Sequence, residues 1–135
     1  MTRTTRFDPR LGLVYVSGTI TGPRSTTQLR LLVDTGAAMS TIVPHVVDEI
    51  GYSPRDGGAR TTVRTALGSE HGYVLRVARF AALGFAMANF PVNVFDLADR
   101  DVCDGLVGFN FLRCFNCHIR PKDGCILLEN IAPLA

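Results

Sequence analysis

The 135-residue sequence predicts a small all-β protein, a closed β-barrel with one or two short helices. Short alternating apolar segments recur along the chain, and turns rich in glycine and proline separate them at regular spacing. Only two brief segments have a helical pattern. Apolar residues make up 47% of the chain, which excludes a disordered protein. Without an internal repeat or linker, one domain is expected over residues 1–135, with residues 1–10 as a flexible N-terminal segment.

The first two predicted strands, residues 11–20 and 28–33, form a hairpin around a polar turn at residues 22–25. The second strand runs directly into Asp34. Residues 45–50 form the first predicted helix, because their apolar side chains share one face between a proline and a glycine.

The middle of the chain predicts a second hairpin over residues 61–75, with a glycine-containing tip at residues 66–69. Two further strands follow at residues 76–80 and 87–95, separated by a turn at Leu83 and Gly84. The regular spacing of these strands favours a barrel.

The C-terminal third begins with an acidic loop over residues 96–104. A short apolar helix is predicted within residues 109–115. Residues 116–119 and 125–128 then form a last hairpin, turned at residues 121–124.

Charge and hydropathy exclude several classes of partner. The net charge is only +2, and the arginines are scattered, so no nucleic-acid partner is expected. No apolar run approaches the roughly 18 residues of a membrane span. The polar N-terminus has no signal-peptide pattern, so we expect a cytoplasmic protein without a membrane partner.

The segment around Asp34 is the most informative local feature. An acidic side chain directly after a buried apolar strand is costly unless it has a purpose. Thr35 and Gly36 are suited to a tight turn, and a carboxylate on such a loop can position and deprotonate water. Alone, the motif is better explained by a turn in which Asp34 caps its own backbone.

A second motif changes that interpretation. Leu106, Val107 and Gly108 precede the second predicted helix, and the glycine-tipped hairpin lies between the two motifs. In this order the segments resemble the retropepsin-like aspartic proteases, a retroviral-type family with many bacterial members. The resemblance extends from about residue 13 to residue 128 and implies a retropepsin-type barrel with a flap hairpin.

The resemblance implies an aspartic endopeptidase that acts on extended peptides without a metal or organic cofactor. Asp34 is similar to the catalytic acid and base, followed by Thr35, Gly36 and Ala37 in the active-site loop. Thr35 would bond across a dimer axis, and Gly36 would contact substrate. The chemistry needs two carboxylates that share a proton, but the chain has one such motif, so we expect a homodimer.

Further roles are implied by the same resemblance. Residues at the flap tip would close over bound peptide, namely Leu67, Gly68 and Ser69. Gly105 and Gly108 would let their chain segment pass close to the active-site loop. The last strand and the tail to Ala135 would supply dimer contacts. Apolar substrate side chains are expected from an aliphatic lining, namely Leu32, Ile42, Val43 and Val107.

Three features depart from the resemblance or allow another interpretation. Asn110 stands where many family members have an aspartate, so a hydrogen bond would replace an ion pair. Glu70 and His71 suggest pH-tuned flap opening, but an exposed polar loop is the simpler explanation. The four cysteines, all in the last third, are expected to be reduced and to fill small apolar core positions rather than a zinc site. A catalytically inactive dimerisation or peptide-binding module of the same fold is the alternative function.

Overall fold

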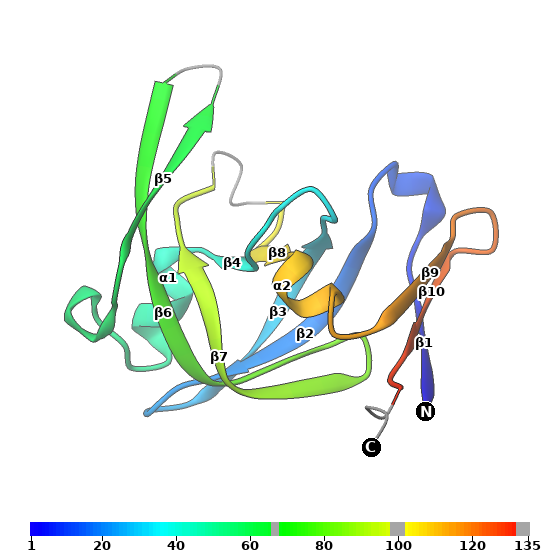
Figure 1. Ribbon diagram of the computed structural model, residues 1–135, viewed down its shortest axis with the longest axis horizontal. Coiled ribbons are helices and arrows are strands. Elements are labelled where there is room, and N and C mark those ends of the chain that lie inside the picture. Colours follow the sequence, from blue (N-terminus) through cyan, green and yellow to red (C-terminus); the bar gives the residue numbers. More distant parts are fainter. Residues whose placement is uncertain (66–67, 98–101, 132–135) are drawn as a thin grey trace.

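The computed structural model describes residues 1–65, 68–97 and 102–131, except the side chains of residues 63–70, and shows two β-sheets and two short α-helices (Figure 1). The strands are β1 (Thr2–Arg6), β2 (Tyr15–Thr21), β3 (Thr26–Val33), β4 (Thr41–Ile42), β5 (Arg60–Thr65), β6 (Gly68–Ala82), β7 (Phe85–Val94), β8 (Gly105–Val107), β9 (Asn116–Arg120) and β10 (Cys125–Glu129). The helices are α1 (Pro44–Glu49) and α2 (Phe109–Leu112). Neither helix, nor any other in the described ranges, has the length and apolar character that a membrane crossing requires.

The larger sheet closes into a barrel. Its strand order is β2-β3-β8-β4-β7-β6-β5, and an additional pairing between β2 and β6 joins the ends of a six-strand ring. β5 stays outside the ring and pairs only with β6 among the described strands. The predicted all-β fold, a closed barrel with two short helices, is therefore confirmed.

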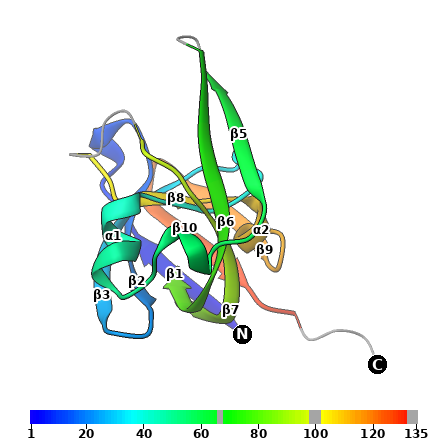
Figure 2. The ribbon, with the colours of Figure 1, turned by 90° about the vertical axis from the view of Figure 1, so that its left-hand side faces the viewer.

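A long hairpin, made by β5 and the first half of β6, projects beyond the barrel (Figures 1 and 2). The sequence predicted two separate strands where β6 is one continuous strand, because its alternating pattern has no turn residue near position 76. The turn at Leu83 and Gly84 is confirmed, with φ angles of 55° and 86°. Both residues adopt the left-handed region that two-residue hairpin turns require.

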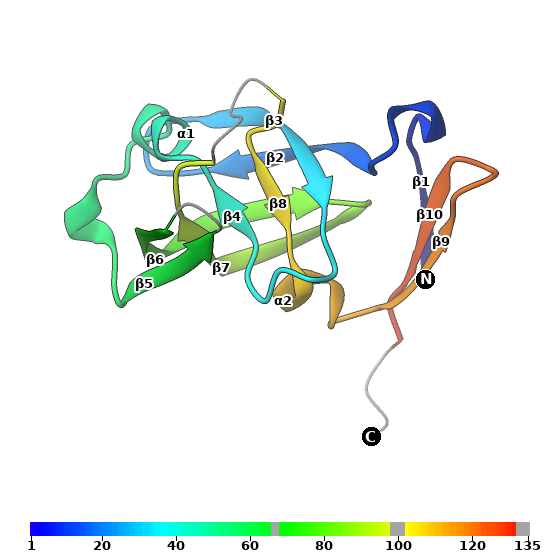
Figure 3. The ribbon, with the colours of Figure 1, turned by 90° about the horizontal axis from the view of Figure 1, so that it is seen from above.

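The smaller sheet has the order β1-β10-β9 and lies beside the barrel together with the N-terminus (Figures 1 and 3). β1 pairs with β10 over five residues, from Thr2 opposite Glu129 to Arg6 opposite Cys125. The expectation of a flexible segment over residues 1–10 is therefore wrong for β1. Most side chains of β1 are exposed, which explains its polar sequence. Threonine favours a strand, and backbone hydrogen bonds to β10 hold the segment in place.

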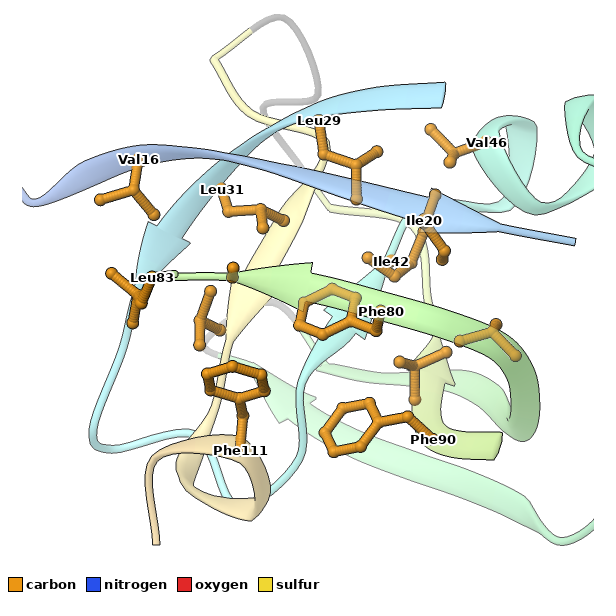
Figure 4. Close-up of a cluster of buried hydrophobic side chains, with 14 of the residues drawn as sticks. Val16, Ile20, Leu29, Leu31, Ile42, Val46, Phe80, Leu83, Phe90 and Phe111 are labelled. Atoms are coloured by element: carbon orange, nitrogen blue, oxygen red, sulfur yellow. The ribbon is translucent and has the colours of Figure 1, made fainter. Parts of the chain in front are cut away.

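The core of the barrel is built around three aromatic rings (Figure 4). Phe80 stacks on Phe90 at a centroid distance of 5.3 Å, and both meet the edge of Phe111 at 5.7 and 5.9 Å. Phe80 and Phe111 are fully buried. Because Phe111 belongs to α2, burial of its ring fixes this short helix against β6 and β7.

Replacing Phe111 tests the connection between core and helix. Phe111→Ala is expected to lower the free energy of unfolding by about 3 to 5 kcal/mol, because it leaves a cavity in the core. Urea denaturation measures this change. Phe109→Ala is the matched control, because Phe109 lies on the same helix with 50% of its surface exposed. Equal losses in the two variants would contradict the packing described.

Hydrogen exchange tests the position of β1. Its amide protons that bond to β10 are expected to exchange far more slowly than that of Thr35, which lies in an exposed loop. Exchange is measured residue by residue by NMR. Exchange of all β1 amides at the rate of an unstructured peptide would restore the expectation of a flexible N-terminal segment.

Candidate active site

Asp34 lies directly after β3, and its backbone and side chain are both held by hydrogen bonds. Its N–H donates to the carbonyl of Val107 in β8 at 3.0 Å. Its Oδ1 accepts the N–H of Gly36 at 2.9 Å, and its carbonyl accepts the N–H of Ala37 at 3.3 Å. The backbone turn that the sequence suggested is present, and it fixes one carboxylate oxygen of a half-buried side chain.

The start of α2 binds the loop that follows Asp34. The N–H groups of Phe109 and Asn110 donate to the carbonyls of Ala37 and Ala38, at 2.7 and 3.1 Å. The first N–H groups of a helix have no partner within the helix. Here the loop carbonyls satisfy two of these groups, so the helix and the loop form one hydrogen-bonded unit.

Ser40 and Asn110 make a second connection between loop and helix. Asn110 Oδ1 accepts the Ser40 backbone N–H at 2.7 Å and the Ser40 hydroxyl at 2.9 Å. Its Nδ2 donates to the carbonyl of Pro91 at 2.9 Å, and Ser40 Oγ accepts the N–H of Gly108 at 2.9 Å. The expected hydrogen bond at Asn110 is confirmed. The carboxamide uses both a donor and an acceptor, which an ionised aspartate does not offer.

Two glycines permit close approaches here, Gly108 to the active-site loop, as the resemblance implied, and Gly105 to β4. A Cβ atom at Gly108 would lie 2.5 Å from the backbone carbon of Met39. A Cβ atom at Gly105 would collide with the carbonyl oxygen of Thr41. Any larger residue at either position would push β8 away from the loop and β4.

A cavity of about 420 Å³ lies next to Asp34. Its lining consists of Asp34, Ala37, Ala38, Met39, Thr41, Thr61, Thr62, Asn93, Phe95, Leu97 and Leu106. Among the residues that the structure describes, Asp34 is the only ionisable side chain in that lining. The expected aliphatic lining is wrong: Ile42, Val43 and Val107 are fully buried in the core, and Leu32 is not among the lining residues. Adjacent strand residues face opposite sides, so Thr41 and Leu106 line the cavity instead.

Sequence reasoning missed the polar pair Thr61 and Asn93 in this wall. Thr61 Oγ1 on β5 donates to Asn93 Oδ1 on β7 at 2.6 Å. Asn93 has only 7% of its surface exposed, and its backbone N–H donates to the carbonyl of Ser40 at 2.8 Å. The sequence does contain a sign of this pair, since Asn93 stands between Val92 and Val94. A polar residue inside an apolar strand needs a buried hydrogen-bond partner.

The remaining predicted site residues belong to the active-site loop or to the β5–β6 hairpin. Thr35 and Gly36 are exposed on the active-site loop, and the Thr35 side chain makes no hydrogen bond to any residue that the structure describes. Gly68 and Ser69 belong to β6, opposite Thr65 and Arg64 at the end of the hairpin. Leu67 lies outside the described residues.

The cysteines divide into two classes by burial, and none of the four forms a disulfide. Cys103 and Cys125 are buried, as expected. Cys114 and Cys117 are exposed, so the prediction of core positions is wrong for them, because one ends the turn after α2 and the other lies on the edge strand β9. Within the described ranges, no three His, Cys, Asp or Glu side chains come together as a metal site would require.

Comparisons with known proteins agree with this geometry. Residues 16–111 match the family model described as "Aspartyl protease". No curated protein sequence matches the chain.

Solved structures that share the fold include the following two. One is a retropepsin-like aspartic protease from Rickettsia conorii, with 19% identity, a TM-score of 0.72, and coverage of 96% of this chain and 91% of that one. The other is the retroviral protease-like domain of Ddi1 from Leishmania major, with 20% identity, a TM-score of 0.59, and coverage of 88% and 90%. The fold is therefore retropepsin-like, and because the family model covers most of its length, the chain belongs to the aspartyl protease family.

Proposed function

We propose that the protein is an aspartic endopeptidase that hydrolyses peptide bonds in extended polypeptides, with one Asp34 from each of two copies. The observation that carries this proposal is the Asp34 carboxylate beside the cavity. Asp34 is positioned by backbone hydrogen bonds, while Thr35 and Gly36 next to it are exposed. A second copy of the loop has access to this surface, and the family membership supports the same reaction.

The chemistry requires the second copy. One carboxylate, as the base, takes a proton from water, and the resulting hydroxyl attacks the peptide carbonyl. The other carboxyl, as the acid, donates a proton to the carbonyl oxygen, which gives a tetrahedral diol. The diol then collapses: the newly protonated carboxyl gives its proton to the amide nitrogen, the newly ionised carboxylate takes a proton from one hydroxyl, and the C–N bond breaks to release the amine and the carboxylic acid. One Asp34 cannot hold both protonation states at once, so two copies share one proton. Two carboxylates close enough to share a proton titrate as a pair, and activity depends on the form of the pair that carries one proton.

The cavity and the hairpin provide the remaining parts of a peptide site. A volume of about 420 Å³ accommodates a substrate side chain next to the carboxylate. Thr61 and Thr62 of β5 line it, so the base of the hairpin is part of the site. Gly68 and Ser69, near the hairpin's end, would close over the bound peptide and exclude water.

The position of β10 changes the expected dimer contact. β10 pairs with β1 on one side and β9 on the other, so both of its edges are occupied within the chain. A second copy that extends this sheet would therefore pair with β1 or β9 rather than with the last strand.

Replacing the carboxylate is the direct test. Asp34→Asn is expected to abolish cleavage of a mixed peptide library, because the variant has no carboxylate to activate water. Mass spectrometry of the products between about pH 4 and 7 measures the loss. Asp48→Asn on the exposed face of α1 is the control and should cleave like the wild type.

Cleavage by the wild type should also rise more than linearly with protein concentration while monomers predominate. No cleavage by wild-type protein that is folded and dimeric would contradict the proposal and favour a peptide-binding module. Unchanged cleavage by Asp34→Asn would place the catalytic group elsewhere.

The carboxamide of Asn110 is expected to be required for a stable active-site loop. Asn110→Asp removes the donor to Pro91 and should lower the free energy of unfolding by about 1 to 3 kcal/mol at neutral pH. A protonated carboxyl again has a donor, so the loss should shrink as the pH falls through the pKa of the new side chain.

Urea denaturation at pH 7.5 and at pH 4 measures both parts of this prediction, relative to wild type at each pH. Gln28→Glu, the same exchange of an amide for a carboxylate at an exposed position opposite Thr19, is the matched control. A loss that is the same at both pH values would show that the donor to Pro91 does not matter.

A further inference from the structure

The lining of the active-site cavity is partly apolar and partly polar. Six apolar side chains contribute to it: Ala37, Ala38, Met39, Phe95, Leu97 and Leu106. Of the polar side chains other than Asp34, Thr41 makes a 3.4 Å contact with the Met39 carbonyl, and Thr62 lies 3.4 Å from His71 Nδ1. The bond of 2.6 Å between Thr61 and Asn93 is the shortest of these contacts.

The packing of β7 does not by itself require a hydrogen-bonded polar pair at Thr61 and Asn93. Asn93 is 93% buried between Val92 and Val94 of β7, where an apolar side chain of similar size would pack at no desolvation cost. Replacing both partners of a buried hydrogen bond by apolar groups of the same shape is often nearly neutral for stability. A polar pair retained in the wall of a binding cavity therefore points to a role in recognition.

Gly72 leaves space for the pair. It lies opposite Thr61 in the β5–β6 ladder. A Cβ atom there would lie 3.0 Å from both Asn93 Oδ1 and Thr61 Oγ1, and still closer to the carbonyl oxygen of Val94. The backbone of the hairpin thus approaches the pair directly, which fixes both side chains at the cavity wall.

The chemistry of the pair defines what it can recognise. Asn93 Oδ1 is used by the Thr61 hydroxyl, so the Asn93 amino group supplies donors and the Thr61 oxygen keeps lone pairs as an acceptor. A donor beside an acceptor matches a carboxamide. Among the described residues, the lining has no basic side chain and holds the Asp34 carboxylate, so an acidic substrate side chain would be repelled by Asp34 with no cation to offset the repulsion.

We propose that Thr61 and Asn93 are the specificity-determining residues of this cavity, and that they select substrates with an uncharged carboxamide side chain, glutamine or asparagine, at this subsite. The inference rests on the proposed function, because it names the substrate class of the same site. The aliphatic part of the side chain contacts the apolar lining, and its amide reaches the Thr61–Asn93 pair.

Paired peptides test the selection. Each pair differs at one position near the cleaved bond, with glutamine in one peptide and methionine in the other. The wild type is expected to show a kcat/KM at least roughly tenfold higher for the glutamine peptide at one position. In the Thr61→Val, Asn93→Leu double variant that preference should vanish or reverse, while cleavage of the methionine peptide persists.

Two controls complete the experiment. Thr27→Val makes the same threonine-to-valine exchange on β3, outside the cavity lining, and should leave the preference unchanged. If the double variant does not fold, Thr61→Val alone supplies the comparison, because valine has the shape of threonine without the hydroxyl. A wild-type preference for methionine, or a glutamine preference that survives loss of the pair, would overturn the proposal.

Binding separates this inference from the proposed function. The same peptides are titrated calorimetrically into the Asp34→Asn variant, which keeps the cavity but lacks the catalytic carboxylate. Preferential binding of the glutamine peptide, without cleavage by the wild type, would leave the subsite in place and overturn the catalytic proposal. Equal binding of the two peptides, together with cleavage by the wild type, would overturn the subsite inference and leave the catalytic proposal in place.

Discussion

The hydrogen-bonded contact between the Asp34 loop and the start of α2 is the constraint on which the site depends. Asp34 bonds to Val107, and the first N–H groups of α2 bond to the loop carbonyls. Ser40 and Asn110 add a second, side-chain connection. The loop and the helix approach so closely only because Gly108 has no side chain. A larger residue at Gly108, or loss of the Asn110 carboxamide, would therefore disrupt the hydrogen bonds that orient the Asp34 carboxylate.

The same contact links the site to the core and to the cavity. Phe111 anchors α2 in the aromatic cluster, so core packing holds the loop indirectly. Ser40 also accepts the backbone N–H of Asn93, which extends the network to the lining of the cavity. One continuous set of buried contacts therefore positions the carboxylate, the loop that would meet a second copy, and the residues that would recognise the substrate.

Local motifs, together with the family resemblance that they carry, were sufficient to predict much of this arrangement. The acid after an apolar strand, the two glycines and the short helix each leave a signature in neighbouring residues, and the structure brings them together as expected. What escaped prediction depends on distant partners. β1 is polar and becomes a strand only because β10 lies beside it. The partner of Asn93 is Thr61, which is 32 positions away. The lining of the cavity depends on which face of β4 and β8 points inward, which a short strand does not reveal.

The central claim is that two copies of Asp34 share one active site, and subunit mixing tests it most directly. Wild-type protein is held at a fixed concentration, equilibrated with increasing Asp34→Asn protein, and assayed for peptide cleavage. A shared site predicts that activity falls as the variant is added, because mixed dimers carry one carboxylate and are inactive. The decline should follow the fraction of dimers with two wild-type copies. Activity that stays constant as the variant is added would contradict the account, because each chain would then hold a complete site.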